Sequence, residues 1–130
     1  MIVVDASAVL EVLLRTVDAG AVEERLFAGG ERLHAPHLLD LEVVHAIRRY
    51  RLRGEIAERR AADAIQLLAV LPVTRHEHRP LVDRIWALYR NLTAYDAAYI
   101  ALAEALDAPL ITRDARMASA LGHRAVVELG

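Results

Sequence analysis

The sequence contains neither cysteine nor lysine. Without cysteine, disulfide bonds, thiolate metal sites and cysteine nucleophiles are all excluded. Every one of the 16 basic residues is arginine, which excludes any mechanism that needs a lysine side chain. The exclusive use of arginine, together with abundant alanine, is typical of a GC-rich genome. The lack of cysteine also fits the reducing environment of a cytoplasm.

Long apolar runs and a strong net charge are missing as well. Charged residues interrupt each apolar segment before it reaches transmembrane length, so we expect no membrane contact. The start, MIVVDAS, has no basic region and reaches an acid at Asp5, which argues against a secretory signal peptide. The net charge of −2 neither favours nor opposes nucleic acid as a partner. These features together predict a cytoplasmic protein.

The chain has 130 residues, of which 55% are hydrophobic, and its mean hydropathy is +0.24. This length suits one domain with a substantial core. No internal repeat, low-complexity tract or long linker divides the chain, so we predict a single domain over residues 1–130. The high apolar content also leaves room for an apolar surface that contacts a protein partner.

Short β-branched runs alternate with helical patterns along the chain. Strands are expected at 2–5, 32–36, 72–78, 109–114 and 124–129. Helices are expected at 6–15, 19–28, 37–54, 55–71, 79–91, 94–104 and 115–121. Such alternation is typical of an α/β fold with a mainly parallel sheet. In such folds, ligands bind beyond the carboxyl ends of the strands, near the point where the strand order reverses.

Two of the expected helices have an apolar face that is easily read. The face of the helix at 79–91 is expected to contain Leu81, Ile85, Trp86 and Leu88. The face of the helix at 55–71 is expected to contain Ile56, Ala64, Leu67 and Leu68. We expect these residues to pack inward, with Trp86, Leu88 and Tyr89 in the core or against a second copy of the chain.

Four acids interrupt or directly end apolar segments: Asp5, Glu42, Asp96 and Asp114. Asp96 is the most conspicuous, because the segment LTAYDAAYIALAE is otherwise apolar from Ala94 to Glu104 and predicts a buried helix. Each acid, taken alone, also suits a simpler structural role. Asp5, Asp96 and Asp114 each suit a helix amino terminus, with Thr93 as the N-cap before Asp96, and Glu42 suits a partly exposed helix position.

Considered together, the four acids indicate a metal site. Carboxylates that fold brings together repel one another and raise one another's pKa unless a cation lies among them. Oxygen ligands without cysteine favour Mg²⁺, with Mn²⁺ as a substitute, over Zn²⁺. Such ions activate water and neutralise charge on phosphorus during phosphodiester hydrolysis. Helix amino termini beside the acids would add positive potential for a phosphate.

The chain resembles the PIN-domain ribonucleases, specifically the VapC toxins of type II toxin–antitoxin pairs. Four segments carry the resemblance: VVDASA, HLLDLEVVHAIRR, LTAYDAAYIALAEAL and PLITRDARMASA. The last two at this spacing are the most specific, and the similarity covers essentially the whole chain. It implies a three-layer α/β/α PIN-like domain, a Mg²⁺-dependent endoribonuclease that acts on RNA, a homodimer, and inhibition by a VapB-like antitoxin.

Carried over by position, the metal-binding and catalytic residues are Asp5, Glu42, Asp96 and Asp114. Asp40 is the other candidate for the second acid, but the match to LEVVHAIRR favours Glu42. Ser7 and Thr112 correspond to small polar residues beside the metal site. Arg113 and Arg116 flank Asp114 and are placed to meet a phosphate.

A second basic segment, RRYRLRG, places four arginines around Tyr50 at the end of the helix at 37–54. They suit either RNA phosphates, with Tyr50 as a stacking surface, or a solvated helix end with Tyr50 in the core. His45, one turn after Glu42, is the histidine that we single out for a role in the active site. The other histidines give only a weak indication of a zinc site.

The sequence therefore predicts a metal-dependent endoribonuclease in which activated water attacks phosphorus in line, leaving a 5′-phosphate and a 3′-hydroxyl. Phosphoacceptor receiver domains fit less well, because they use a strand-end lysine. Haloacid-dehalogenase phosphatases open with Asp-x-Asp, whereas Ser7 follows Asp5 at that spacing here. The remaining alternative is a catalytically silent PIN-like module whose role is to bind a protein partner.

Overall fold

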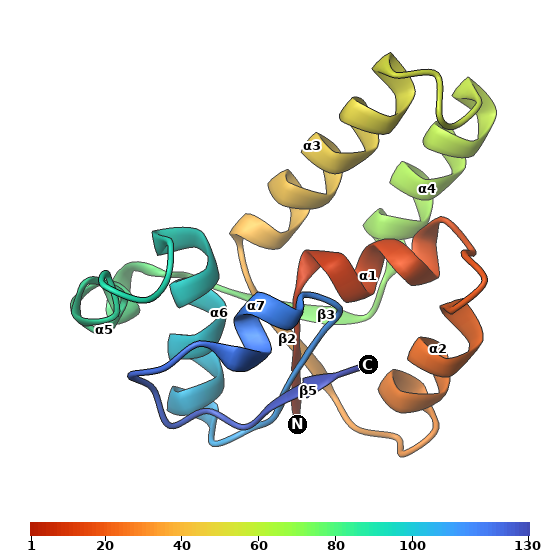
Figure 1. The fold of residues 1–130 in the computed structure, drawn as a ribbon. Coiled ribbons are helices and arrows are strands. Elements are labelled where there is room, and N and C mark those ends of the chain that lie inside the picture. Colours follow the sequence, from red (N-terminus) through yellow and green to blue (C-terminus); the bar gives the residue numbers. More distant parts are fainter.

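The computed structural model describes all 130 residues and contains a central sheet of five parallel strands (Figure 1). The strands are β1 (Ile2–Val4), β2 (Leu33–Pro36), β3 (Val73–His76), β4 (Leu110–Thr112) and β5 (Val127–Leu129). Their order in the sheet is β3-β2-β1-β4-β5, and every neighbouring pair is parallel. The predicted α/β fold with a mainly parallel sheet is confirmed.

Helices flank this sheet on both sides, as the three-layer prediction requires. They are α1 (Ala6–Leu13), α2 (Ala19–Phe27), α3 (Leu38–Leu52), α4 (Glu58–Val70), α5 (Val82–Ala87), α6 (Ala94–Leu106) and α7 (Ala115–Ser119), with a 3₁₀ turn η1 (Arg79–Leu81) before α5. Figure 1 shows α1 and α2 on one side of the sheet and α5 and α6 on the other. The pair α3 and α4 extends beyond the sheet (Figure 1).

Strand β1 lies at the centre of the sheet because its side chains are apolar on both faces. Ile2, Val3 and Val4 are fully buried, as expected for a short β-branched strand covered by helices on both sides. The chain runs outward from β1 to β2 and β3, and then crosses back to β4 on the other side of β1. The strand order therefore reverses between β1 and β4, and Asp5 and Asp114 follow the carboxyl ends of these two strands.

Helix α6 is the buried helix predicted from its apolar sequence. Its residues from Ala97 to Glu104 are all buried, because it packs on β1, β2 and β4 and is covered by α5. The hydroxyl of Thr93 accepts a hydrogen bond from the backbone N–H of Asp96 at 3.1 Å, which makes Thr93 the predicted N-cap. Asp96 consequently lies in the first turn of α6.

The predicted helix at 79–91 differs from the structure, which has the short turn η1 followed by the six-residue helix α5. Leu88 is buried, but Trp86 is 68% exposed and Tyr89 is 50% exposed. A core position is therefore wrong for Trp86 and Tyr89, and the alternative, a contact with a second copy of the chain, stays a prediction. Their rings stack on each other with centroids 4.6 Å apart. Helix α5 forms an outer layer over α6, and a helix in that position buries only one side.

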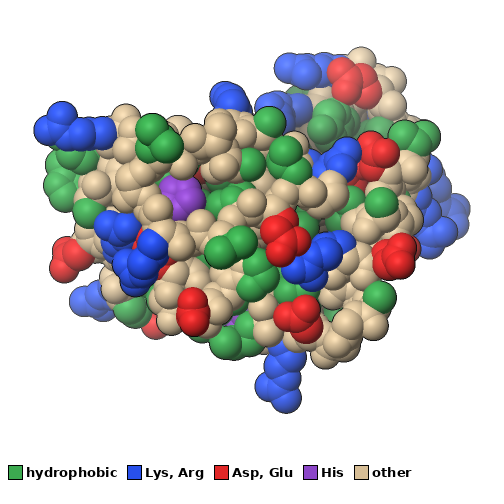
Figure 2. Space-filling model, turned by 60° about the horizontal axis from the view of Figure 1, so that its bottom comes forward, with side chains coloured by type: hydrophobic (Ala, Val, Ile, Leu, Met, Phe, Trp, Pro, Cys, Tyr) green, Lys and Arg blue, Asp and Glu red, His purple; other side chains and the backbone are tan.

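One further apolar residue, Leu67 of α4, is more exposed than its expected inward position, at 37%. The reason is again geometric, because α4 contacts α3 and α1 along one narrow side. None of the helices combines the length and the apolar content that crossing a lipid bilayer requires. Figure 2 shows that acidic and basic side chains are dispersed over the face turned toward the amino ends of the strands.

Candidate active site

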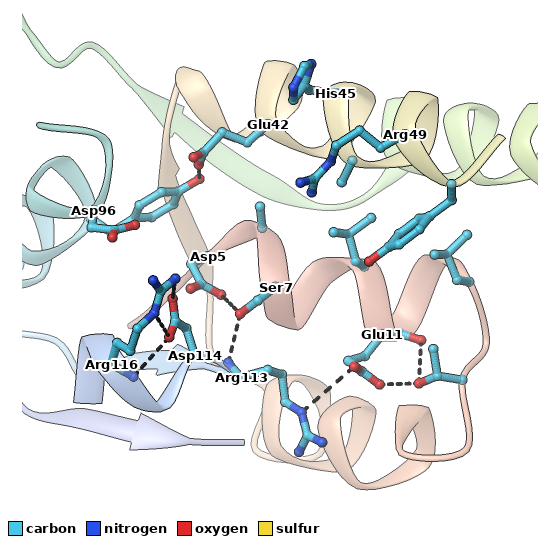
Figure 3. A pocket seen from close by; sticks show the side chains of 17 residues that line it. Asp5, Ser7, Glu11, Glu42, His45, Arg49, Asp96, Arg113, Asp114 and Arg116 are labelled. Atoms are coloured by element: carbon cyan, nitrogen blue, oxygen red, sulfur yellow. Dashed lines mark hydrogen bonds and ion pairs between the residues drawn. The ribbon is translucent and has the colours of Figure 1, made fainter. Parts of the chain in front are cut away.

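A pocket at the carboxyl edge of the sheet collects side chains from widely separated parts of the sequence (Figure 3). It encloses about 480 Å³ and is lined by residues of α1, α3 and α6 and of the segment that follows β4. All four predicted acids line it: Asp5, Glu42, Asp96 and Asp114. The fold thus brings the four carboxylates around one cavity, and their metal-binding and catalytic roles stay a prediction.

Asp5 closes β1 and is the N-cap of α1. Its Oδ1 accepts hydrogen bonds from the backbone N–H of Ala8 at 3.1 Å and from Ser7 Oγ at 2.7 Å. Its Oδ2 accepts from Thr112 Oγ1 at 2.5 Å. Burial raises the pKa of Asp5 in spite of these donors, and the nearby charge of Asp96 raises it further. The carboxylate is therefore held in a fixed orientation but is not neutralised by a cation.

Ser7 and Thr112, which the sequence places beside the site, connect the acids at the ends of β1 and β4. Ser7 Oγ lies 3.2 Å from Thr112 Oγ1 and accepts a hydrogen bond from the backbone N–H of Arg113 at 2.8 Å. Thr112 Oγ1 also accepts from the backbone N–H of Asp114 at 3.0 Å. Two hydroxyls consequently fix the distance between Asp5 and Asp114, although these acids are far apart in sequence.

Glu42 enters the pocket from the second turn of α3. The hydroxyl of Tyr99, a buried residue of α6, donates to Glu42 Oε1 at 2.6 Å. Burial raises the pKa of Glu42, and the charges of Asp96 and Asp5 add to the effect, while the bond from Tyr99 opposes it. Sequence reasoning missed Tyr99, although its place three residues after Asp96 puts both on one face of a helix.

Asp96 has both of the roles that its sequence suggests. Its backbone N–H is bonded to the N-cap Thr93, while its carboxylate lines the pocket. Burial raises the pKa of Asp96, and the charge of Asp114 raises it further. The acid is thus positioned by a helix cap and left without an ion-pair partner.

Asp114 differs from the other three acids because an arginine accompanies it. Burial alone would raise its pKa, but hydrogen bonds from the side chain and backbone of Arg116 hold the pKa below its ordinary value. The ion pair joins Arg116 Nη2 and Asp114 Oδ2 at 3.3 Å. Because the side chain of Arg116 is 91% exposed, this contact is easily exchanged for water or another anion.

Arg113, the other arginine expected to meet a phosphate, lines the pocket but already has acidic partners. Its guanidinium lies 2.8 Å from Asp18 and 3.9 Å from Glu11. Its side chain also donates to the backbone carbonyl of Gly130. Most of its charge is therefore used to hold α1, α2 and the end of the chain together. Glu11, which also lines the pocket, was not predicted.

The structure separates the arginines of the segment RRYRLRG. Arg49 and Tyr50 line the pocket, whereas Arg48 lies on a separate hollow at the outer face of α3. Arg53 pairs with Glu55 at 4.0 Å. His45 lines the pocket one turn after Glu42, at the place the sequence suggested.

Two other sequence features lie outside the pocket. Asp40, the rejected candidate for the second acid, is bound by both nitrogens of the Arg75 guanidinium fork at 2.8 and 3.2 Å. His34 and His76 face each other between β2 and β3, with Nδ1 and Nε2 2.8 Å apart. Both pairs connect neighbouring elements of the fold.

The pocket fits a divalent cation in its donor chemistry and its charge. Its acids offer hard oxygen ligands, and three of them have raised pKa values that a cation would relieve. No three histidine, aspartate or glutamate side chains converge closely enough to hold a metal ion as they stand. Each of the four carboxylates keeps lone pairs that its hydrogen bonds leave free, so its oxygens remain available to a cation.

Comparison with known proteins places these features in a family. A model of the PIN domain matches residues 2–121. The chain is 44% identical over 128 residues to Ribonuclease VapC1 of Mycobacterium tuberculosis, covering 98% of this chain and 96% of that protein. It is 43% identical to Ribonuclease VapC12 of the same species, covering 99% of this chain and 98% of that protein.

A similar fold is found in the crystal structure of VapBC2 from Rickettsia felis, which was determined bound to a DNA fragment from the promoter of the pair. The TM-score is 0.69, and the superposition covers 98% of this chain and 98% of that chain. At 10% sequence identity, this similarity concerns the fold alone.

Proposed function

Because the chain belongs to the PIN-domain family and, within it, to the VapC ribonucleases, the toxins of toxin–antitoxin systems, we propose that its acidic pocket cleaves RNA with a divalent metal ion. The proposed ligands and catalytic residues are Asp5, Glu42, Asp96 and Asp114. The observation that carries this proposal is the meeting of these carboxylates in one pocket with only Asp114 paired to an arginine.

Mg²⁺ is the proposed ion, and Mn²⁺ is the proposed substitute. When bound, such an ion supplies Lewis acidity to phosphate oxygens and lowers the pKa of water. The donor bonds from Ser7 and Thr112 orient Asp5, and Tyr99 orients Glu42. The amino ends of α1 and α6 lie beside the pocket, where their partial positive charge favours an anionic phosphate.

The proton of the attacking water needs an acceptor, and the pocket offers the carboxylates of Asp5, Glu42 and Asp96, none of which is paired to an arginine. Water attacks phosphorus in line and passes a proton to one of these carboxylates, the P–O3′ bond breaks, and the leaving O3′ takes up a proton from solvent, so that the products carry a 5′-phosphate and a 3′-hydroxyl. The 2′-hydroxyl takes no part, so no cyclic phosphate forms.

The proposal extends to partners and location. We propose that residues 1–130 act as one PIN domain, as a homodimer in the cytoplasm, where RNA is accessible and a cognate VapB-like antitoxin is made. Membership of the VapC family supports RNA and a VapB antitoxin as partners. The exposed apolar side chains of Leu41, Trp86 and Tyr89 support a protein interface.

The activity is tested with purified protein and single-stranded RNA in Mg²⁺ and in EDTA. Cleavage is expected in Mg²⁺ alone, and Asp5→Asn should abolish it. Asp40→Asn is the matched control, because Asp40 carries the same carboxylate outside the pocket. Circular dichroism verifies that both variants are folded. Full activity in EDTA or in Asp5→Asn, or products that end in a cyclic phosphate, would reject the mechanism.

The toxin role is tested in cells. Expression of the wild type is expected to arrest growth, Asp5→Asn is expected not to, and co-expression of the gene immediately upstream should relieve the arrest. Arrest by Asp5→Asn would favour the catalytically silent binding module instead.

A further inference from the structure

The pocket extends well beyond the four acids. Figure 3 shows Glu42 and Arg49 in succession along α3, on the side that faces α1, while Asp5, Ser7 and Glu11 follow one another from the start of α1 along that helix. The cavity continues between these two helices toward Leu10, Leu14 and Tyr50. The four acids thus lie at the strand ends, and the lining away from them combines the apolar and aromatic side chains with Glu11 and Thr16.

Arg49 is the arginine that this pocket leaves without a partner. Three arginines line the cavity. Arg113 is bound by Asp18 and Glu11, and Arg116 is bound by Asp114. The guanidinium of Arg49 makes no ion pair or hydrogen bond within the protein, and its side chain extends from α3 toward α1 (Figure 3). Its charge and its donors are therefore available to an anion that enters the pocket.

The position of Arg49 indicates which anion it meets. Arg49 is seven residues after Glu42 on α3, which corresponds to about 10 Å along the helix axis. A phosphate bound by Arg49 would therefore belong to a nucleotide near the one whose phosphate is cleaved at the four acids. An RNA strand that approaches a cluster of carboxylates also needs a cation outside that cluster to hold it, because the acids repel phosphates that carry no metal.

The side chains that line the pocket beside Arg49 are suited to contact the base of a nucleotide. Leu10 of α1, Leu14 directly after α1 and Tyr50 of α3 line the same pocket as Arg49. Tyr50 is half-buried against the core, so its ring is held in place while one side lines the cavity. Unpaired bases stack on aromatic side chains in this way in proteins that bind single-stranded RNA.

We propose that the part of the pocket around Arg49 and Tyr50 is a subsite for the nucleotide next to the cleaved bond, in which Arg49 binds a non-scissile phosphate and Tyr50 contacts the adjacent base. This subsite rests on the proposed ribonuclease function for its substrate. It selects single-stranded RNA, because the base must leave its stack to enter the space between α1 and α3.

The chain provides a matched control for Arg49 in its neighbour Arg48. Both are exposed arginines of α3 without an acidic partner, but Arg48 faces the outer hollow and not this pocket. We therefore compare Arg49→Gln with Arg48→Gln in the Asp5→Asn background with Mg²⁺. The probe is a short fluorescein-labelled single-stranded RNA of mixed sequence, and its dissociation constant is measured by anisotropy over a range of salt concentrations.

Arg49→Gln is expected to weaken binding about tenfold and to lower the slope of log affinity against log salt by about 0.7, the value for one lost phosphate contact on a single strand. Arg48→Gln should change the dissociation constant less than twofold. Equal effects of the two substitutions would overturn the subsite. This experiment measures a difference in RNA binding between two variants, so its outcome does not depend on cleavage. Cleavage is tested separately by the EDTA experiment.

The position of the phosphate is tested by neutralising single linkages of the RNA with 2′-deoxy methylphosphonates. In the protein with Arg49 intact, neutralising one linkage within two nucleotides of the cleaved bond should weaken RNA binding. In Arg49→Gln, neutralising the same linkage should have no such effect on binding. Coupling at the scissile linkage alone, or at none, would contradict the proposal.

The base contact is tested with an abasic nucleotide beside the sensitive linkage. Removal of that base should weaken binding to the protein with Tyr50 and to Tyr50→Phe, but much less to Tyr50→Leu. Thermal denaturation shows whether Tyr50→Leu is folded. If the abasic nucleotide weakens binding equally in all three proteins, Tyr50 does not contact the base.

Discussion

Asp96 and Glu104 are both carboxylates of helix α6, eight residues apart, but they lie in opposite electrostatic environments. Glu104 is 9% exposed, and Arg84 donates to its two oxygens at 2.7 and 2.9 Å. The backbone N–H of Arg124 adds a third donor at 2.9 Å. These hydrogen bonds, chiefly those from Arg84, lower the pKa of Glu104 to about 2. Burial and the charge of Asp114 instead raise the pKa of Asp96.

The comparison separates two uses of a buried acid. Where a carboxylate joins parts of the fold, the chain supplies the arginine, as Arg84 does for Glu104 and Arg75 does for Asp40. At Asp5 and Glu42 the chain supplies hydroxyl donors, and at Asp5, Glu42 and Asp96 it supplies no ion-paired cation. Holding these unpaired charges together therefore lowers the stability of the folded protein, which is the pattern expected of a functional site.

The largest effect should follow from Asp96→Asn. Loss of the carboxylate is expected to lower the rate of RNA cleavage about 100-fold or more, equivalent to about 3 kcal/mol in the barrier. Stability should not fall, because the ionised acid has a raised pKa and its charge opposes folding. Cleavage kinetics and urea denaturation of the same preparation measure both quantities. A variant that keeps its activity would remove the distinction between the two acids.

Glu104→Gln should give the reverse result. The shift of the pKa from 4.5 to about 2 corresponds to about 3 kcal/mol of stability at neutral pH, which the amide loses. Activity per folded molecule should be unchanged, because Glu104 does not line the pocket. Urea denaturation measures the loss, and Glu23→Gln, at an exposed position of α2 without an ion pair, is the control.

The pH dependence of that loss has a definite sign. Because the folded pKa of Glu104 is depressed, its contribution is complete above pH 4.5 and disappears as pH falls toward 2. The stability difference between the wild type and Glu104→Gln should therefore shrink over this range. A difference that stays constant down to pH 2 would mean that the ion pair is not its source.

Mg²⁺ binding should distinguish Asp96 from Glu104 through a smaller effect, a change in melting temperature. A metal that binds only the folded protein adds about 1.4 kcal/mol at ten times its dissociation constant, which raises the melting temperature by a few degrees. We expect this rise in the wild type and in Glu104→Gln, and no rise in Asp96→Asn. Differential scanning calorimetry measures it without any RNA. An equal rise in all three proteins would place the metal outside the pocket.

The smallest effect is the pH dependence of stability at Asp96. A raised folded pKa means that its contribution is complete below the unfolded pKa and is lost as pH rises through the folded pKa. Asp96→Asn should thus be relatively more stable at neutral pH than in acid, opposite in sign to Glu104→Gln. Denaturation at a series of pH values, without metal, measures both slopes. Slopes of the same sign would contradict the comparison.

Local pattern was sufficient to predict most elements of this fold. The run at 2–5 and the segment after Thr93 each have one compatible conformation, because β-branched runs favour buried strands and an N-cap fixes where a helix begins. Trp86 shows where pattern fails. Its spacing suits an inward face, but α5 is short and covers α6 from outside, so the ring is exposed.

The candidate site was predicted in part. Its four acids were found because each interrupts an apolar segment, and a charge in such a place needs an explanation. Tyr99 was missed because a tyrosine in a buried helix looks like any other core residue until its hydroxyl is seen to meet Glu42. Arg48 and Arg49 were equivalent in sequence, since only the position of α1 decides which side of α3 faces a cavity.

The sequence by itself determined the periodicity of the strands and helices, the absence of thiol and lysine chemistry, and the placement of acids at the ends of apolar runs. Only the tertiary structure decided which charges are neutralised. Arg84 and Arg124, each twenty residues from Glu104 in sequence, donate hydrogen bonds to its carboxylate. Asp5 instead experiences the negative charge of Asp96. Electrostatic energy depends on distance in space and on burial, and neither can be read from the order of residues along the chain.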